Sequence, residues 1–354
     1  MKLIKNRIKY FFILVFTSLI ITMAINFTID PLQQYRKASF YEPYEFAPRY
    51  MAWGMLKNYD YDSVLFGSSM SRNFIKSEID EKLNLNIMKI AMNGTSPHEL
   101  NLLLKFALNK NKNIKKIILN IDLFAFSGEV DRLRFGENSI PFYLQNNIYL
   151  DDYKYLLNVD VLIKNNLKLL ASNKFGLKKD KINYDKFYFN AHRNTYNKNM
   201  ALKDFNNRIK KKSTKNETDK YKYEKLINSF NYNILSHIKK HPNKKFIIFF
   251  PPYSILAYKY FEYKGTLKNM LLLKEEVLNT LIQYQNISIF DFQTTQNITH
   301  NLDLYKDVSH YSADVNSWMV DNIKLNSYII QDINDIKNSI NLLESQIHNY
   351  KLDN

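Results

Sequence analysis

The chain has 354 residues, of which 45% are hydrophobic and 24% are charged, so the composition predicts globular structure rather than disorder. It contains no cysteine, which excludes disulfide bonds, thiolate metal ligands and a cysteine nucleophile. The formal net charge is +16, which suits a nucleic acid, an anionic membrane surface or an acidic envelope polymer as partner. The N-terminal segment decides between these partners.

This segment predicts a membrane anchor. Residues 1–9 are basic, and residues 10–27 form an apolar run without a charge. At about 1.5 Å per residue, the run just spans a hydrocarbon core of roughly 30 Å. The cations before it and Asp30 after it predict a single pass through the cytoplasmic (inner) membrane with the body on the extracytoplasmic, periplasmic side, so we expect no nucleic-acid partner. A cleaved signal peptide is the alternative, with a poor cleavage site at Thr22–Ala24.

Four parts are predicted along the chain. Residues 1–28 are the anchor, residues 29–60 an aromatic linker that packs on the body, residues 61–330 the main domain, and residues 331–354 an amphipathic helix. A largely helical insertion, rich in Asn, Lys and Tyr, is expected within the main domain at about 130–243. The apolar residues of the last helix are spaced for a short a/d seam, which fits either packing back on the body or dimerisation.

Short apolar strands alternate with helices in the main domain. The expected strands are, in chain order, residues 63–66, 86–91, 114–123, 246–250 and 287–290. The expected helices are residues 97–108, 267–283 and 313–326. This pattern predicts an α/β fold with a parallel sheet covered on both faces, and a site beyond the carboxyl ends of the strands. Gly67–Ser69, Asn93–Gly94 and Asp122 are expected at that edge.

The first strand ends in Gly67-Ser68-Ser69, ahead of a predicted helix. A serine at such a turn is exposed, and its own N–H and the helix N-terminus point to where an oxyanion would form. Gly-Ser-Ser is also an ordinary strand-to-helix turn in which a serine caps the helix. Ser68 and Ser71 remain alternative nucleophiles at this stage.

Two further motifs complete the candidate site. Gly94 follows the second strand, just before a capping box of Ser96 and Glu99, and its bare N–H can approach a reacting carbonyl. Asp307 lies three residues before His310, so its carboxylate can turn onto the imidazole Nδ1. That contact fixes the tautomer and leaves Nε2 free to take a proton from a serine.

Taken together, these motifs resemble the SGNH (GDSL-like) hydrolase superfamily over about residues 60–130 and 244–325. More narrowly, the chain is similar to membrane-anchored envelope proteins related to the teichoic-acid D-alanine transfer protein and to the alginate O-acetylation proteins. Ser69 matches the superfamily nucleophile, Gly94 the second-block glycine, and Asp307 with His310 the Asp-x-x-His block. The run Phe249–Tyr253 is similar to the end of the fourth strand in the envelope branch.

Two departures from that pattern stand out. Ser68 replaces the usual aspartate, and Asn120–Asp122 is the nearest counterpart of the Gly-x-Asn-Asp block. The resemblance implies a flavodoxin-like three-layer α/β/α sandwich, catalysis by Ser69, Asp307 and His310, and oxyanion donors at Ser69, Gly94 and, as the nearest third donor, Asn120. It also implies neither metal nor organic cofactor.

The implied function is acyl transfer, such as O-acetylation, to an envelope polysaccharide through an acyl-Ser69 intermediate. A multispanning membrane O-acyltransferase is the implied partner. Two alternatives remain open: an esterase that removes acyl groups from envelope glycans, and a non-catalytic scaffold or binding protein that retains the same fold.

Overall fold

The computed structural model describes residues 2–43, 47–146, 148–176, 185, 195–211 and 215–352. Contacts divide the chain into two compact units. The first unit comprises Met1–Tyr59 and Asn138–Tyr184, and the second comprises Asp60–Glu137 and Asp185–Asn354. The insertion expected over about 130–243 therefore contributes to both units.

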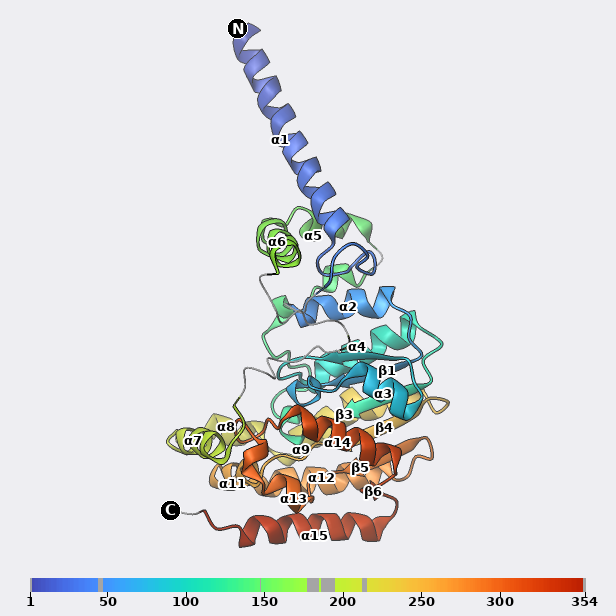
Figure 1. Ribbon diagram of the computed structural model, residues 1–354, viewed down its shortest axis with the longest axis vertical. Coiled ribbons are helices and arrows are strands. Elements are labelled where there is room, and N and C mark those ends of the chain that lie inside the picture. Colours follow the sequence, from blue (N-terminus) through green and yellow to red (C-terminus); the bar gives the residue numbers. More distant parts are fainter. Residues whose placement is uncertain are drawn as a thin grey trace. The chain divides into compact units, whose positions relative to one another are not determined.

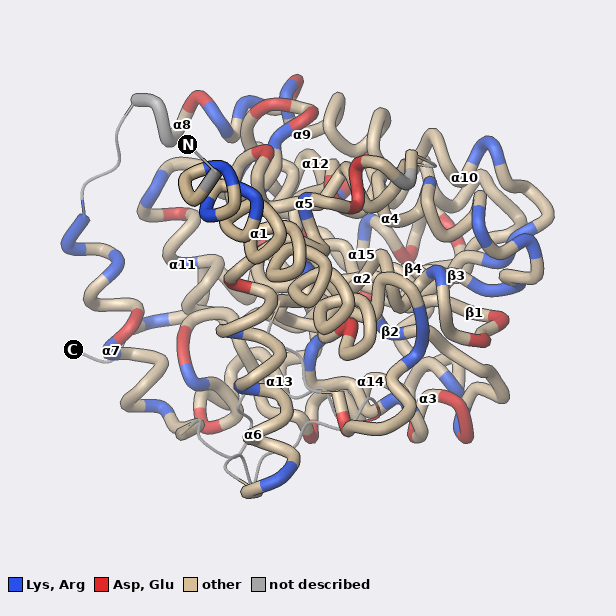
Figure 2. Tube along the Cα trace, turned by 90° about the horizontal axis from the view of Figure 1, so that it is seen from above, with Lys and Arg blue, Asp and Glu red and all other residues tan. Residues whose placement is uncertain are grey.

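The first unit begins with helix α1 (Lys2–Ile29). The stretch Leu3–Ile29 has a mean hydropathy of 2.2 and is long and apolar enough to cross a membrane, which confirms the apolar N-terminal helix predicted from the sequence. Figure 2 shows basic residues gathered at the start of α1, followed by an uncharged remainder. The unit also contains α2 (Pro48–Asn58), η4 (Phe142–Leu144), η5 (Tyr149–Asp152), α5 (Tyr153–Leu156), η6 (Val161–Leu167) and α6 (Lys168–Phe175).

A polar turn ends α1. The carboxylate of Asp30 accepts hydrogen bonds from the backbone N–H groups of Gln34, Tyr35 and Arg36, at 2.8–3.2 Å, and from the hydroxyl of Tyr155 at 2.9 Å. Asp30 itself has a φ of 46°, in the left-handed region that a short polar residue tolerates. The turn therefore redirects the chain at the end of the apolar helix.

The second unit is built on one six-stranded sheet with the order β2-β1-β3-β4-β5-β6. Its strands are β1 (Ser63–Gly67), β2 (Ile87–Ala91), β3 (Lys116–Asn120), β4 (Lys245–Phe250), β5 (Ile287–Asp291) and β6 (Ile329–Ile330). The first five pair in parallel, as predicted, whereas β6 pairs antiparallel with β5. The sheet is thus mostly parallel, and the short antiparallel edge strand β6 is an addition to the five predicted strands.

Helices cover the sheet because the middle of its strands is mainly apolar, with Val64, Ile117 and Ile248 fully buried. Helix α3 (Lys76–Leu83) packs against α14 (Ala313–Lys324), and α9 (Tyr223–Phe230) packs against α4 (Pro97–Lys110) and α12 (Leu267–Leu281). The predicted capping box of Ser96 and Glu99 starts α4. The remaining short elements are η1 (Ser69–Ser71), η2 (Leu123–Phe126), α7 (Lys198–Ile209), α8 (Lys215–Lys220), η9 (Asn231–Leu235), α10 (Ser236–Lys240), α13 (Gln296–Thr299) and η10 (Leu302–Leu304).

The C-terminal helix α15 (Ile333–Asn349) packs back onto its own unit, against α11 (Ile255–Tyr263) and α12 (Figure 1). It buries four residues of the a/d pattern, namely Ile336, Ile340, Leu343 and Ile347. The sequence left open whether this helix packs back on the body or dimerises. In the single chain it packs back on its own unit, because these apolar side chains contact partners there.

Candidate active site

The candidate nucleophile lies in a tight turn at the carboxyl end of β1. Gly67 ends the strand, and a Cβ atom at this position would lie 2.2 Å from the Ser71 Oγ, so the turn requires glycine. Ser68 caps the short helix η1, since its Oγ accepts a hydrogen bond from the Met70 N–H at 3.1 Å. Ser68 and Ser71 are both buried. Among the three serines, only Ser69 presents its hydroxyl to the histidine described next.

Ser69, His310 and Asp307 form a continuous chain of hydrogen bonds. The Ser69 Oγ lies 2.8 Å from the His310 Nε2, and the His310 Nδ1 lies 2.8 Å from the Asp307 Oδ2. With a proton on Nδ1, the Nε2 atom can accept the serine proton. The three residues predicted to act together are therefore brought together with the spacing that nucleophilic catalysis needs.

Asp307 is held as an anion. Burial alone would raise its pKa, but hydrogen bonds and charge from His310, together with the backbone N–H groups of His310 and Ser309, outweigh burial and hold the pKa well below its usual range. The two N–H groups lie 2.8 and 2.9 Å from the Asp307 Oδ1. The carboxylate is thus available to orient His310 and to stabilise the imidazolium once it forms.

The loop that carries His310 is fixed to its surroundings at several points. Tyr305 and Tyr311 form an antiparallel bridge that closes the loop, and the Lys306 N–H donates to the His310 carbonyl at 3.0 Å. The Val308 carbonyl accepts a hydrogen bond of 2.7 Å from the Ser254 hydroxyl. His310 is therefore positioned by the fold before any substrate arrives.

One cavity is lined by Ser69, His310 and Asp307, and Gly94 lies in its wall as well. The Gly94 φ of 59° is in the left-handed region, and a Cβ atom there would lie 2.9 Å from the Arg134 Nε. Both reasons call for glycine at this position. Ser69 and Gly94, the two residues whose backbone N–H groups are the first predicted oxyanion donors, both line the cavity.

Asn120, the third predicted donor, lies beneath the cavity rather than in its wall. Its amide nitrogen, oriented to satisfy its neighbours, lies 3.2 Å from both the Ser68 Oγ and the Ser71 Oγ and 3.1 Å from the Asp122 Oδ2. The side chain is 1% exposed. Asn120 therefore supports the nucleophile turn from below, a role different from the one that the resemblance implies.

Asp122 is the residue of that block that reaches the cavity wall. Burial raises the pKa of its carboxyl, and hydrogen bonds with Ser68, Tyr253 and Asn120 counteract the rise only in part. The Tyr253 hydroxyl donates to the Asp122 Oδ1, so the Phe249–Tyr253 run contributes this tyrosine to the site. The sequence placed Asp122 at the correct edge of the sheet but gave it no role.

The cavity has a volume of about 630 Å³ and a cationic wall. Four basic residues line it, namely Arg132, Arg134, Arg208 and Lys306. Burial, and next the positive charge of Arg134, lower the pKa of Arg132. Arg132 is held by the carbonyls of Ser127 and Ala125, at 3.0 and 2.8 Å. The wall therefore favours a substrate that carries negative charge.

The sequence patterns did not predict this cationic wall. One signal was available: arginine occurs at only eight positions of a lysine-rich sequence, and three of the eight line this cavity. Arginine differs from lysine in its planar group of five N–H donors, which binds carboxylates and phosphates in a fixed geometry. Aromatic side chains from Phe124, Tyr221, Tyr260 and Phe261 complete the wall.

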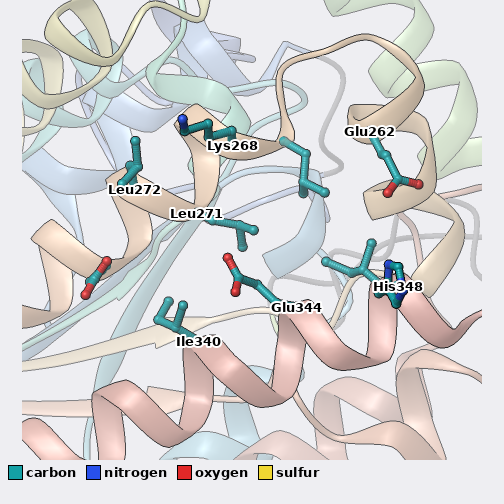
Figure 3. Close-up of a pocket in the computed structure, with 10 residues that line it drawn as sticks. Glu262, Lys268, Leu271, Leu272, Ile340, Glu344 and His348 are labelled. Carbon is teal, nitrogen blue, oxygen red and sulfur yellow. The ribbon is translucent and has the colours of Figure 1, made fainter.

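A second cavity, of about 330 Å³, lies between α12 and α15 (Figure 3). Leu271 and Ile340 line it, with Glu344 and His348 on α15 beside them. Its lining contains no serine, threonine or cysteine that could act as a nucleophile. In the part of the chain that the structure describes, no group of three or more acidic or histidine side chains could hold a metal ion.

Comparison with protein-family models finds none that matches the chain, and comparison with curated proteins finds no match.

Proposed function

We propose that this protein is an extracytoplasmic serine acyltransferase of the SGNH type. The observation that carries the proposal is the hydrogen-bonded chain from Ser69 through His310 to Asp307 in the wall of an open cavity. The strand order 2-1-3-4-5, followed by an antiparallel edge strand, supports the finer proposal of a flavodoxin-like sandwich, because that order is characteristic of flavodoxin-like sheets.

The proposed reaction has two halves. His310 takes the Ser69 proton while the Ser69 Oγ attacks the carbonyl carbon of an acyl donor, and the resulting oxyanion is stabilised by the N–H groups of Ser69 and Gly94. The donor's leaving group departs with the proton from His310, which leaves an acyl-Ser69 ester. An acceptor hydroxyl then gives its proton to His310 and attacks the ester, and Ser69 recovers its proton as the product forms. Asp307 stays ionised throughout.

The cavity wall supports an anionic envelope polysaccharide as the acceptor in this proposal. An anionic envelope polysaccharide presents hydroxyl groups beside carboxylates or phosphates, and the guanidinium groups of Arg132 and Arg134 fit such a neighbour. The basic N-terminus of α1 favours a cytoplasmic start and an extracytoplasmic body, where such polymers lie. A multispanning membrane O-acyltransferase that supplies the acyl group fits this arrangement, and the resemblance to envelope O-acetylation proteins suggests it.

The first test is labelling of the full-length chain in detergent with a fluorophosphonate probe, followed by peptide mapping. We expect an adduct on Ser69 that is lost in Ser69→Ala and strongly reduced in His310→Ala. Ser309→Ala is the matched control, because Ser309 lines the same cavity and its N–H, which contacts Asp307, is retained. No adduct in a folded sample would contradict the proposal and favour the non-catalytic scaffold.

Product analysis separates the transferase from the esterase. Cells that express the wild type are compared with Ser69→Ala cells for the acyl content of the envelope glycan. A transferase raises the acyl content relative to the variant, whereas an esterase lowers it. The same serine serves both reactions, so the sign of the change decides between them.

A further inference from the structure

Residues 159–175, in the first unit, expose large apolar side chains. Val159, Ile163, Leu167 and Phe175 are 60%, 53%, 57% and 66% exposed. Val159, Ile163 and Leu167 follow one another at intervals of four residues, so they lie on one side of the helical segment, and Phe175 is exposed at the end of α6. Single exposed apolar residues are ordinary, but four within 17 residues, three of them in register, call for an explanation.

The outer side of this segment carries an apolar stripe and a charged stripe, which run along its length. A charged residue adjoins each of the four apolar ones, namely Asp160, Lys164, Lys168 and Lys174. The inner side is buried and includes Val161, Asn166, Leu169 and Ser172. We call the four exposed apolar residues the apolar stripe and the four charged ones the charged stripe. Parallel apolar and lysine-rich stripes are typical of helices that lie in a membrane interface.

The segment is fastened to the end of α1. The Asn26 side chain, fully buried, donates hydrogen bonds to the carbonyls of Leu156 and Asn158, at 2.8 and 3.2 Å. The Asn166 side chain donates to the Asn26 Oδ1 at 2.8 Å. One of these hydrogen bonds comes from the segment itself and two from the residues just before it, so together they fix the start of the segment along α1 at one residue.

The depth of that residue follows from the length of α1. Asn26 lies 17 residues after Lys9, which is about 26 Å along the helix axis at about 1.5 Å per residue. With Lys9 in one headgroup region, the opposite boundary of a hydrocarbon core of roughly 30 Å falls close to Asn26. The segment attached to Asn26 therefore lies at this boundary.

The direction of the segment agrees with that position. Figure 1 shows α1 from the side, whereas α6 is seen end-on, so α6 runs across the direction of α1. A helix that crosses an anchor at the membrane boundary lies along the membrane surface rather than through it. Its apolar stripe can then face the acyl chains while the lysines of the charged stripe reach the phosphate groups.

We propose that residues 159–175 form an interfacial helix that inserts the apolar stripe into the lipid leaflet in which α1 ends. The occupant of this face is the lipid bilayer, because the hydrogen bonds to Asn26 hold the segment at the level of the leaflet boundary. The inference rests on the first unit alone and does not depend on the proposed enzymatic function.

The test uses the absence of cysteine from the sequence. Full-length Ile163→Cys and Leu167→Cys chains, labelled with an environment-sensitive fluorophore, are placed one per nanodisc in a mixture of neutral and anionic lipids. Lys57→Cys is the control, because Lys57 is exposed on α2 in the same unit, beyond α6 from the spanning part of α1 in Figure 1. Circular dichroism establishes that each labelled chain is folded.

We expect the labels at 163 and 167 to emit at shorter wavelength than the label at 57. They should lose fluorescence to lipids that carry a nitroxide high on the acyl chain, and less to lipids that carry it at the chain end. Equal quenching of all three labels by aqueous iodide would overturn the proposal. Protection of labels 163 and 167 from both iodide and nitroxide would also overturn it, because that outcome indicates cover by protein rather than by lipid.

Discussion

The Tyr311 hydroxyl donates a hydrogen bond of 3.1 Å to the carbonyl of Met70, the residue after the candidate nucleophile. The Asn316 amide donates to the same oxygen at 3.0 Å. The loop that carries His310 and the turn that carries Ser69 therefore meet at one carbonyl group. The distance between base and nucleophile depends on this junction as well as on the two side chains themselves.

Tyr311→Phe should reduce activity more than its effect on stability suggests. Loss of one buried hydrogen bond costs about 1 kcal/mol in the free energy of unfolding. The same loss loosens the turn beside Ser69, so the rate of probe labelling should fall while the amount of folded protein is unchanged. Tyr305→Phe is the control, because that hydroxyl donates to the Pro252 carbonyl instead. An equal fall in labelling rate in both variants would show that the Met70 junction has no special role.

Asp307→Asn should lower the labelling rate of Ser69 by about 10³- to 10⁴-fold, because an amide in place of the carboxylate favours the wrong imidazole tautomer. Rates of probe labelling measured by intact mass test this value. Asp303→Asn is the control, since Asp303 is a nearby carboxylate that accepts a hydrogen bond from the Lys198 N–H and does not touch His310. A rate for Asp307→Asn near that of the wild type would remove Asp307 from the mechanism.

Arg134→Gln should raise KM for negatively charged substrates and leave neutral substrates unaffected. A charge-assisted hydrogen bond is worth about 1.5–3 kcal/mol, so KM for an acceptor glycan bearing carboxylates or phosphates should rise by about 10- to 100-fold. Turnover of a neutral ester should be unaffected. Lys222→Gln, a change of an exposed cation outside the cavity lining, is the control. A rise in KM that is equal for charged and neutral substrates would contradict the assignment.

Gly94→Ala should slow the acylation of Ser69 in addition to reducing stability through backbone strain. An alanine at a φ of 59° costs about 1–2 kcal/mol in stability. Gly136→Ala is the matched control, because Gly136 has a φ of 78° and open space where a Cβ atom would be added. Both variants should lose stability, measured by denaturant unfolding, with Gly94→Ala losing at least as much because of the Arg134 side chain, and Ser69 labelling should slow in Gly94→Ala alone.

His237 should make the fold sensitive to acid. Burial, assisted by the charges of His241 and Lys240, lowers the pKa of His237 to about 4, whereas an unfolded chain has a histidine pKa of about 6.5. The unfolded state therefore binds this proton first, so stability is lost as pH falls from about 6.5 to 4, by about 3 kcal/mol in all. His237→Gln should flatten this part of the profile in urea unfolding. His348→Gln, a change of an exposed histidine, should leave it intact.

Local patterns in the sequence were sufficient to predict the parallel strands and the site triad. Continuous apolar runs marked the five parallel strands, because a strand buried on both faces has no polar alternation. The box of Ser96 and Glu99 marked the start of α4, because capping depends on residues three apart. Ser69, Asp307 and His310 could be predicted as candidate site residues because each follows a predicted strand or precedes a predicted helix.

Features set by long-range packing could not be read in this way. Strand β6 has only two residues and carries no pattern, since its place is set by the exposed edge of β5. Asn120 matches the third block in sequence, yet the buried hydroxyls of Ser68 and Ser71 turn its amide beneath the cavity. From the sequence, residues 159–175 were predicted only as part of a helical insertion. Their position depends on contacts between η6 and α1, which local patterns do not reveal.

The nucleophile and its base are separated by 241 residues in the chain. A ribosome that adds about 5–20 residues per second needs roughly 10–50 s to go from one to the other. Throughout that interval Ser69 is an ordinary alcohol, with no imidazole to take its proton. In the proposed mechanism, the order of the two residues along the chain therefore delays the onset of reactivity until nearly the whole second unit has been synthesised and folded.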